Sequence, residues 1–239
     1  MAVTLELLGA FPILNSLPES TLTTIADNSS IRKFSRRGVV MAAGDIEESV
    51  CFLFEGRLQG IDFTIDGREV GLFFVEPGEF CGELGLFDDN PQSEYIIALT
   101  TAVVIFVPRE VLKIAMKESA YMLSVLSSKL AARIRTMTYQ RSLLALPSIT
   151  QRVCCQLWML VPEKHKSSER VLQNREDVSI INLPTHMEIA IMLSVSRETV
   201  TRVFQTLQKR QIVKRNGAGI LIVNDLEELK GLAEGSLEL

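Results

Sequence analysis

The chain carries two patterns of hydrophobic positions. Between residues 31 and 108, short runs of β-branched and aromatic residues alternate with turn residues, which is the pattern of antiparallel strands joined by tight turns. The runs are residues 39–41, 50–54, 70–75, 95–99 and 103–107. Gly44, Gly56, Gly67 and Gly78 recur at intervals of 12, 11 and 11 residues, as repeated hairpin turns require. This pattern predicts a β-roll or jelly roll.

On either side of this region the hydrophobic period is that of helices. Residues 4–27 predict a short helical entry that two prolines interrupt. From Arg109 one long helix is predicted to run to about Leu144, with apolar residues at three- and four-residue intervals. At about 1.5 Å per residue this helix would be longer than a small domain is wide, so we expect it to pack against its own copy. The alternative is packing against the β-roll alone. The seam is predicted to consist of Leu123, Leu126, Leu130 and Met137.

A pair of helices with a tight turn is predicted between residues 183 and 207. Thr185 followed by Glu188 is a capping box that starts the first helix. Ser194 turns the chain in place of the usual glycine, which predicts a slightly strained turn, and Ser196 caps the second helix. The spacing favours a helix-turn-helix over two ordinary core helices. A helix-turn-helix needs a small residue where its helices cross, a turn residue between them and a buried β-branched residue in the second helix. Ala190, Ser194 and Val200 meet these three requirements.

Basic residues gather after this turn. Residues 208–223 predict a strand, an Asn-Gly turn and a second strand, which form the wing of a winged helix. From Arg197 to Arg215 there are six basic residues and one acid, although the whole chain has a net charge of −4. Such a local basic face indicates a surface for phosphates. In a major groove, the outer face of the second helix would present four side chains to base edges: Arg197, Glu198, Thr201 and Arg202.

The distribution of charge and the residues that end helices suggest two parts, a sensor and a DNA-binding part. Residues 1–145 carry 13 basic and 18 acidic side chains, and residues 146–239 carry 12 and 11. Pro147 ends the long helix, and Ser148 with Gln151 predicts another capping box. Residues 163–177 are predicted to form a loop and 178–183 a strand. The predicted domains are 1–108, 109–146 and 147–239. Without an apolar run of about 20 residues or a signal sequence, we expect a cytoplasmic protein with no membrane contact.

The sequence offers no spacing that is typical of a metal site or an enzyme. His165 lies in a polar stretch and His186 in the first turn of a helix. There is no CxxC pair, P-loop, nucleophile elbow or HExxH motif, so neither a metal nor a catalytic residue is expected. The scattered cysteines are predicted to be buried thiols: Cys51, Cys81, Cys154 and Cys155.

A glycine-rich stretch follows the predicted strands. Residues 77–87 read PGEFCGELGLF, and the three glycines let the backbone approach a ligand. Gly82 precedes Glu83, whose carboxylate is an acceptor suited to a ribose hydroxyl. The alternative is a glycine-rich turn with a solvated glutamate.

The order of elements resembles that of the Crp/Fnr superfamily of bacterial transcription regulators, over nearly the whole chain. Residues 77–87 are similar to the phosphate-binding cassette of that family, and residues 196–202, SRETVTR, are similar to its recognition-helix signature. The resemblance implies an α+β fold with an N-terminal cyclic-nucleotide-binding β-roll, a dimerisation helix and a C-terminal winged helix-turn-helix. It also implies a homodimer that binds double-stranded DNA at a pseudo-palindromic operator and works with RNA polymerase, for instance as an activator.

By this resemblance Arg197, Glu198 and Arg202 would read the bases of a TGTGA-like half-site. Thr199 would contact a phosphate, and Lys214 and Arg215 on the wing are expected to contact DNA of any sequence. The runner-up hypothesis is an effector-sensing module that acts through protein contacts and does not bind specific DNA.

The effector site departs from the family pattern. Members that bind cyclic AMP carry an Arg-Ser pair where this chain has Gln92-Ser93, so the cationic phosphate clamp is missing. The adenine-facing positions of the long helix correspond to Met137 and Thr138, and the ligands of haem and iron–sulfur members are absent. We therefore expect cyclic di-GMP rather than cyclic AMP, or no ligand. The expected contacts are Gly82, Glu83, Gln92, Ser93 and Thr138, with charge from Arg133 and Arg135.

Overall fold

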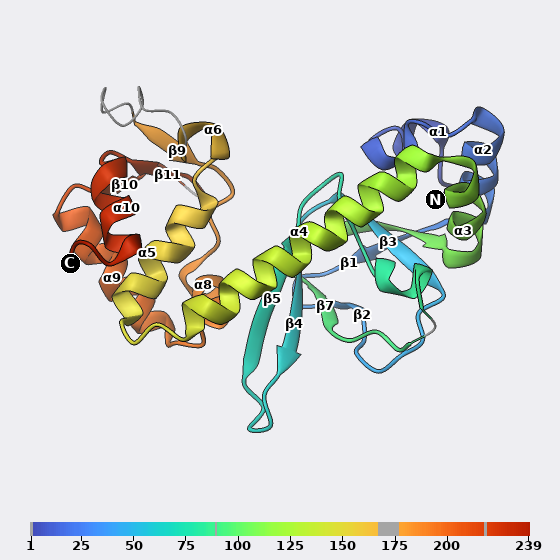
Figure 1. Ribbon diagram of the computed structural model, residues 1–239. Helices are drawn as coiled ribbons and strands as arrows, with labels where there is room; N and C mark the ends of the chain where they lie inside the picture. Colours follow the sequence, from blue (N-terminus) through green and yellow to red (C-terminus); the bar gives the residue numbers. More distant parts are fainter. Residues whose placement is uncertain (1, 89, 167–176, 218) are drawn as a thin grey trace. The chain divides into compact units, whose positions relative to one another are not determined.

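The computed structural model describes residues 2–88, 90–166, 177–217 and 219–239 (Figure 1). Contacts within the chain divide it into two compact units, Met1–Thr136 and Met137–Leu239. The division falls within a helix, whereas the sequence placed domain boundaries after residues 108 and 146.

The first unit contains two antiparallel four-stranded sheets, with strand orders β1-β8-β3-β6 and β2-β7-β4-β5. Side chains from both sheets form one buried apolar cluster, so the two sheets enclose a core as the predicted β-roll requires. The strands are β1 (Ser30–Phe34), β2 (Val39–Met41), β3 (Ser49–Glu55), β4 (Leu58–Phe63), β5 (Glu69–Val75), β6 (Phe80–Cys81), β7 (Tyr95–Ala98) and β8 (Ala102–Pro108).

Alternation along β3 shows how the sequence builds two cores. Cys51 and Leu53 face the cluster between the sheets, whereas Val50 and Phe52 face a second cluster under the helices. All five predicted runs are strands. The sequence missed β1, β4 and β6, because β1 is largely polar, β4 is interrupted by Gln59 and Gly60, and β6 has only two residues.

The predicted glycine turns are confirmed. Gly44, Gly56, Gly67 and Gly78 have φ angles of 88°, 94°, 79° and 87°, in the region that favours glycine. Gly56 also has no room for a side chain, because a Cβ atom would lie 2.4 Å from the carbonyl oxygen of Thr101.

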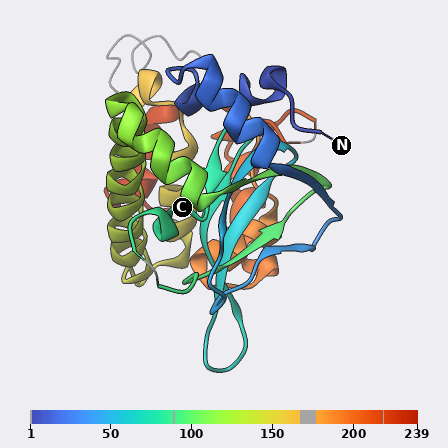
Figure 2. The same ribbon diagram turned by 90° about the vertical axis from the view of Figure 1, so that its right-hand side faces the viewer.

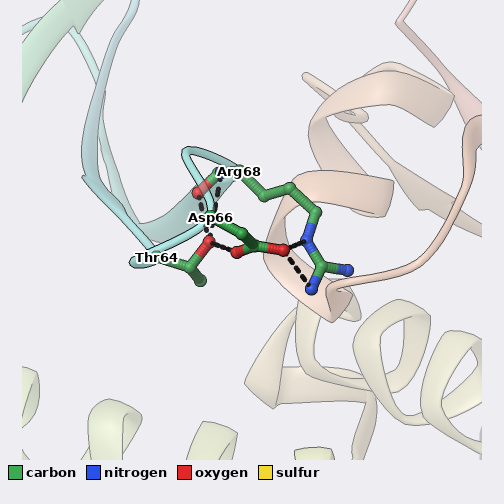
Figure 3. A network of polar contacts seen from close by, with 3 residues as sticks. All are labelled: Thr64, Asp66 and Arg68. Carbon is green, nitrogen blue, oxygen red and sulfur yellow. Dashed lines mark hydrogen bonds and ion pairs between the residues drawn. The ribbon is translucent and has the colours of Figure 1, made fainter.

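Gly67 lies at the tip of the β4–β5 hairpin, which projects from the roll in Figures 1 and 2. Figure 3 shows the polar contacts that close this tip. The Asp66 carboxylate accepts hydrogen bonds from the Thr64 hydroxyl and from Arg68 Nε, the latter at 2.7 Å. These two donors hold the pKa of Asp66 below its ordinary value. Ile65 lies fully exposed in the same turn.

Helices cover the outer face of the sheet that contains β3, and Figure 1 shows α1, α2 and α3 gathered beside the first turns of α4. The single helix predicted from Arg109 to Leu144 is wrong, because it is two helices. Ser119 interrupts it with a φ of −132° and accepts a hydrogen bond from Met122 N at 3.1 Å, as an N-cap does. The elements are α1 (Leu5–Leu8), η1 (Pro12–Leu14), α2 (Glu19–Asn28), α3 (Arg109–Glu118) and α4 (Ala120–Leu144).

The predicted dimer seam on α4 needs one correction. Leu126 is 1% exposed within the single chain, because it belongs to the core beneath the helices. Leu123 and Met137 are 44% and 52% exposed, and Leu130 is half-buried.

The second unit packs helices and a small antiparallel sheet, ordered β10-β11-β9, around one apolar core. The core includes Cys154 and Leu157 of α5 and Phe204 of α9. The elements are α5 (Ile149–Leu160), α6 (Glu163–Lys166), β9 (Val178–Ile180), α8 (His186–Leu193), α9 (Arg197–Lys209), β10 (Val213–Arg215), β11 (Leu221–Val223) and α10 (Leu226–Glu234).

Some local predictions for this unit are corrected. Ser148 caps α5 by accepting from Gln151 N at 3.2 Å, but the Gln151 side chain donates to the Ala233 carbonyl, so there is no capping box. Residues 163–166 are helical, not a loop, and 167–176 lie outside the described residues. The first wing strand begins at Val213, because α9 continues to Lys209.

All four cysteines are free and buried, as predicted. Among the described residues, no three His, Cys, Asp or Glu side chains gather as a metal site would require. A search of the same residues finds no helix whose length and apolar character would let it cross a membrane.

Candidate nucleic-acid interface and effector site

Three caps fix the turn between α8 and α9. The predicted capping box is present: Glu188 N donates to Thr185 Oγ1 at 3.3 Å, and Thr185 N donates to Glu188 Oε2 at 2.9 Å. Ser194 ends α8 in the left-handed region with φ 53°, which costs roughly 1–2 kcal/mol for a residue with a side chain. Ser196 then caps α9 by accepting from Thr199 N at 3.2 Å. The predicted helix-turn-helix and its strained serine are therefore confirmed.

Helix α9 divides cleanly into a buried and an exposed face. Val200, Val203, Phe204 and Leu207 are buried in the core of the unit. The opposite face of the first turns exposes Arg197, Glu198 and Arg202, whereas Thr199 is half-buried beside the cap. The structure thus brings the three predicted base-reading side chains to one exposed helix face.

Four basic groups of this unit are open to an anionic partner. Arg197 and Arg202 lie on α9, and Lys214 and Arg215 lie exposed on β10. Within the described part of the chain, no carboxylate forms an ion pair with any of the four. Their charges are therefore available to DNA phosphates or base edges.

Thr201 differs from the prediction. It is half-buried, its hydroxyl donates to the Arg197 carbonyl at 2.9 Å, and its Oγ1 lies 2.9 Å from Nδ1 of His186. Because the hydroxyl proton goes to the carbonyl, we assign the His186 Nδ1 as the donor to Thr201.

His186 is a residue whose place at this interface the sequence did not indicate. Its ring centroid lies 4.4 Å from that of Phe204. Burial lowers the pKa of His186, and the positive charges of Arg215 and Arg197 lower it further. The only signal in the sequence is that His186 directly follows the residue that caps α8.

The glycine-rich stretch of the first unit forms the candidate effector site. Gly82 is buried with φ 79°, which favours glycine, and a Cβ atom there would also displace the end of the Met41 side chain. It leads into the short helix η2 (Glu83–Leu86). The Glu83 side chain is 0% exposed, so the alternative of a solvated glutamate is wrong.

Arg133 of α4, which was expected to supply charge to an effector, instead reaches this carboxylate. Its Nη1 lies 3.1 Å from Glu83 Oε1 and 3.8 Å from Oε1 of Glu94, which is also buried. The Ser93 hydroxyl donates to the other oxygen of Glu94. Glu94 carries no signal in the sequence, because a glutamate at the start of a strand is usually solvated.

The other expected contacts are placed differently. The Gln92 side chain is buried, and its Nε2 has no hydrogen-bond partner among the described residues. Thr138 is exposed and belongs to the second unit, whereas the cassette belongs to the first. Arg135 is exposed on α4.

These residues do not fit the phosphate of a cyclic mononucleotide. Gln92 is neutral where a clamp arginine would stand, and Glu94 adds a buried negative charge beside Glu83. Arg133 is already paired with both carboxylates. A phosphate would therefore meet a neutral side chain at the clamp position and an arginine that is already engaged.

The β-roll with its glycine cassette and the winged helix with an exposed basic face define a class: DNA-binding regulators with a cyclic-nucleotide-type sensor. Two family descriptions match the two parts, "Cyclic nucleotide-binding domain" over residues 31–119 and "Crp-like helix-turn-helix domain" over residues 151–232. The chain belongs to the Crp/Fnr superfamily of transcription regulators.

Its relatives agree with this assignment. It is 27% identical over 212 residues to the "cAMP-activated global transcriptional regulator CRP" of Pasteurella multocida, covering 85% of this chain and 95% of the relative. It is 26% identical to the regulator Vfr of Pseudomonas aeruginosa, with coverages of 80% and 88%. The structure of FixK2 from Bradyrhizobium japonicum matches with a TM-score of 0.68 and 20% identity, covering 85% of this chain and 96% of FixK2. The two relatives from Pasteurella multocida and Pseudomonas aeruginosa are described as transcriptional regulators, not enzymes.

Proposed function

We propose that this protein is a homodimeric transcription regulator that binds double-stranded DNA in a sequence-specific manner. The observation that carries the proposal is the exposed face of the first turns of α9. Arg197 and Arg202 lie there, with no ion-pair partner in the described residues. Two such helices in a dimer would enter successive major grooves of a pseudo-palindromic operator, with half-sites about one helical turn, roughly 10 base pairs, apart. The protein would act in the cytoplasm, together with RNA polymerase.

The alternative is a sensor that acts through protein contacts without specific DNA. The structure gives two reasons to prefer DNA. A helix that no longer met DNA would gain nothing from exposed arginines at its first turns, whereas base edges and phosphates offer them acceptors. Lys214 and Arg215 on the wing extend the same basic surface to a second element.

Binding measured over a range of salt concentrations tests this function. Replacing Arg197 or Arg202 by Ala should cost on the order of 1 to 3 kcal/mol each on the operator and relax the base preference, because the lost contacts are to bases. Replacing Lys214 or Arg215 by Ala should weaken operator and random DNA alike and reduce the salt dependence, because the lost contacts are to phosphates. Equal losses on specific and random DNA for the α9 arginines would contradict the base-reading assignment.

The effector is a separate question. Relatives are described as cAMP-activated, and a structural neighbour from Xanthomonas campestris, with a TM-score of 0.64 and 21% identity, is described as a "c-di-GMP Responsive Global Regulator". We propose that cyclic AMP does not control this protein, because Gln92 cannot replace a cationic clamp. Cyclic di-GMP and a sensor without a ligand are the remaining alternatives. The pairing of Glu83 and Glu94 with Arg133 favours the second, since it engages a cation that a phosphate would need.

A further inference from the structure

Arg133 lies at the meeting point of three elements of the first unit. Its guanidinium is paired with Glu83 of the cassette and with Glu94, the residue before β7. It also stacks on Phe73 of β5, with Cζ 3.8 Å from the ring centroid. One side chain of α4 therefore contacts the cassette, the residue before β7 and a ring of β5.

The two carboxylates need this cation. Glu83 is fully buried, and neither of its oxygens has a hydrogen-bond partner among the described residues. The 3.1 Å contact with Arg133 lacks the alignment of a hydrogen bond, so the attraction between opposite charges links the two groups. A buried carboxylate is tolerated only when a cation or donors compensate its lost hydration. Removing Arg133 would therefore take from both buried carboxylates the cation that they share.

A second cation of α4 also lies near Glu83. Burial lowers the pKa of Lys129, and the charge of Glu83 acts in the opposite direction. Lys129, one turn before Arg133 on α4, donates to the Phe80 carbonyl and lies 4.0 Å above the Phe80 ring. Because its nitrogen also contacts β6, Lys129 anchors the same helix face to the strand within the cassette. The helix is thus attached to the roll at two successive turns.

We propose that Arg133 is a built-in occupant of the sensor site, and that it performs for this protein what a bound effector performs in a ligand-dependent regulator. By bridging Glu83 and Glu94, it ties the cassette and β7 to α4, which carries the exposed apolar residues proposed for the dimer. The bridge holds this arrangement without a nucleotide. Operator binding is then independent of ligand and depends on the bridge. This inference rests on the proposed DNA-binding function.

The first test measures operator affinity of the full-length protein, dialysed until its absorbance shows no nucleotide. We expect the wild type to bind without a nucleotide and to change little when cyclic AMP, cyclic GMP or cyclic di-GMP is added. Arg133→Gln and Glu94→Gln should lower operator affinity about tenfold, within the usual range of coupling between sites. Lys117→Gln is the matched control, because it removes an exposed cation from the preceding helix α3 and leaves the bridge intact. It should bind within about twofold of wild type, since an exposed charge outside the bridge contributes little.

Two outcomes of this test would overturn the proposal. One is a bridge variant, folded by circular dichroism, that binds the operator as tightly as wild type. The other is a clear rise in wild-type affinity on adding any of the nucleotides. If the wild type showed no preference for any DNA sequence, the proposed function would fail instead.

A second test reads the sensor without DNA. In the double variant Gln92→Arg with Glu94→Ala, the clamp cation returns and the opposing carboxylate is gone. Calorimetry should show that this variant gains cyclic AMP binding that the wild type lacks. Binding of cyclic AMP by the wild type as tight as by the double variant would show that the carboxylates and Arg133 do not close the site. The outcome does not depend on operator binding, so it separates the two proposals.

Discussion

At the scale of single residues, His186 shows how a histidine next to a cap becomes part of a basic surface. Its Nδ1 donates to Thr201, its ring packs on Phe204, and Arg197 and Arg215 are the charged groups that act on it. Burial and these two cations favour the neutral imidazole in the free protein. Bound DNA would bring phosphates to the same place and favour the imidazolium.

The proposed complex should therefore take up a proton at His186, and operator affinity should rise as the pH falls through the ordinary histidine range near ~6.5. The rise should not exceed about tenfold per pH unit, because one proton is involved. Fluorescence anisotropy of labelled operator at several pH values measures it. His186→Gln should flatten the profile, whereas His165→Gln, which removes the other histidine, should not. A profile of the His186 variant that still follows the wild type would assign the proton to another group.

Stability should change in the opposite direction. The pKa of His186 is lowered in the folded state, so the unfolded chain binds more protons in this range. The stabilising contribution of the neutral ring is present above the unfolded pKa and is lost as the pH falls through the lowered pKa of the folded state. In thermal unfolding without DNA, the melting temperature of wild type should therefore fall on acidification more than that of His186→Gln.

Turn glycines and one strained serine could be predicted from the sequence, whereas the positive φ angles of Arg37, Asn182 and Gln211 and the residues with a special partner could not. The four turn glycines and Ser194 were identified because a positive φ is a local property that glycine or a short polar residue reveals. Glu94 and His186 were missed because their roles depend on Arg133 and Thr201, which lie 39 and 15 positions away in the chain. Nothing in the local pattern distinguishes a solvated glutamate from one paired in the interior.

At the scale of elements, the break between α3 and α4 is the main difference from the sequence prediction. The hydrophobic spacing continues from Arg109 to Leu144 without a proline or glycine, so a single helix was expected. Tertiary contacts override this pattern. Ser119 Oγ lies 2.9 Å from Ser16 Oγ, at the junction with η1, and the chain turns there so that both helices pack on the same sheet.

If Ser119 caps α4, Ser119→Ala should destabilise the first unit by about 0.5 to 2 kcal/mol, the usual cost of losing an N-cap. Urea unfolding followed by circular dichroism measures this loss. Ser128→Ala is the matched control, because Ser128 is exposed within α4 and alanine is a better helix former there. Fluorescence of Trp158 reports the second unit and should keep its transition. Equal stability of the Ser119 variant and wild type would mean that the cap contributes nothing to the start of α4.

At the scale of the whole molecule, α4 performs two tasks on different faces. Leu126 and Met122 complete the core of the first unit, and Arg133 reaches the cassette. Leu123 and Met137 remain exposed and Leu130 half-buried, on positions separated by seven residues. A seven-residue spacing keeps side chains on one face of a helix that packs against a second copy. The sequence predicted this face but included Leu126, because spacing alone does not show which neighbour buries a leucine.

Leu130→Glu should therefore dissociate the proposed homodimer. In the dimer the substitution would place two like charges in an apolar interface, and burying each ion without a partner costs several kcal/mol. In the monomer the same side chain lies at a half-buried position where water can reach it, so the fold should survive. Light scattering should show the monomer mass of 26.6 kDa for the variant and twice that mass for wild type.

Leu126→Ala serves as the contrast, because a cavity in the core should lower the melting temperature and leave the mass dimeric. A Leu130→Glu protein that kept the dimer mass would move the interface away from this face of α4. Loss of operator binding together with loss of the dimer would link the two proposals, since a single recognition helix reads only one half-site.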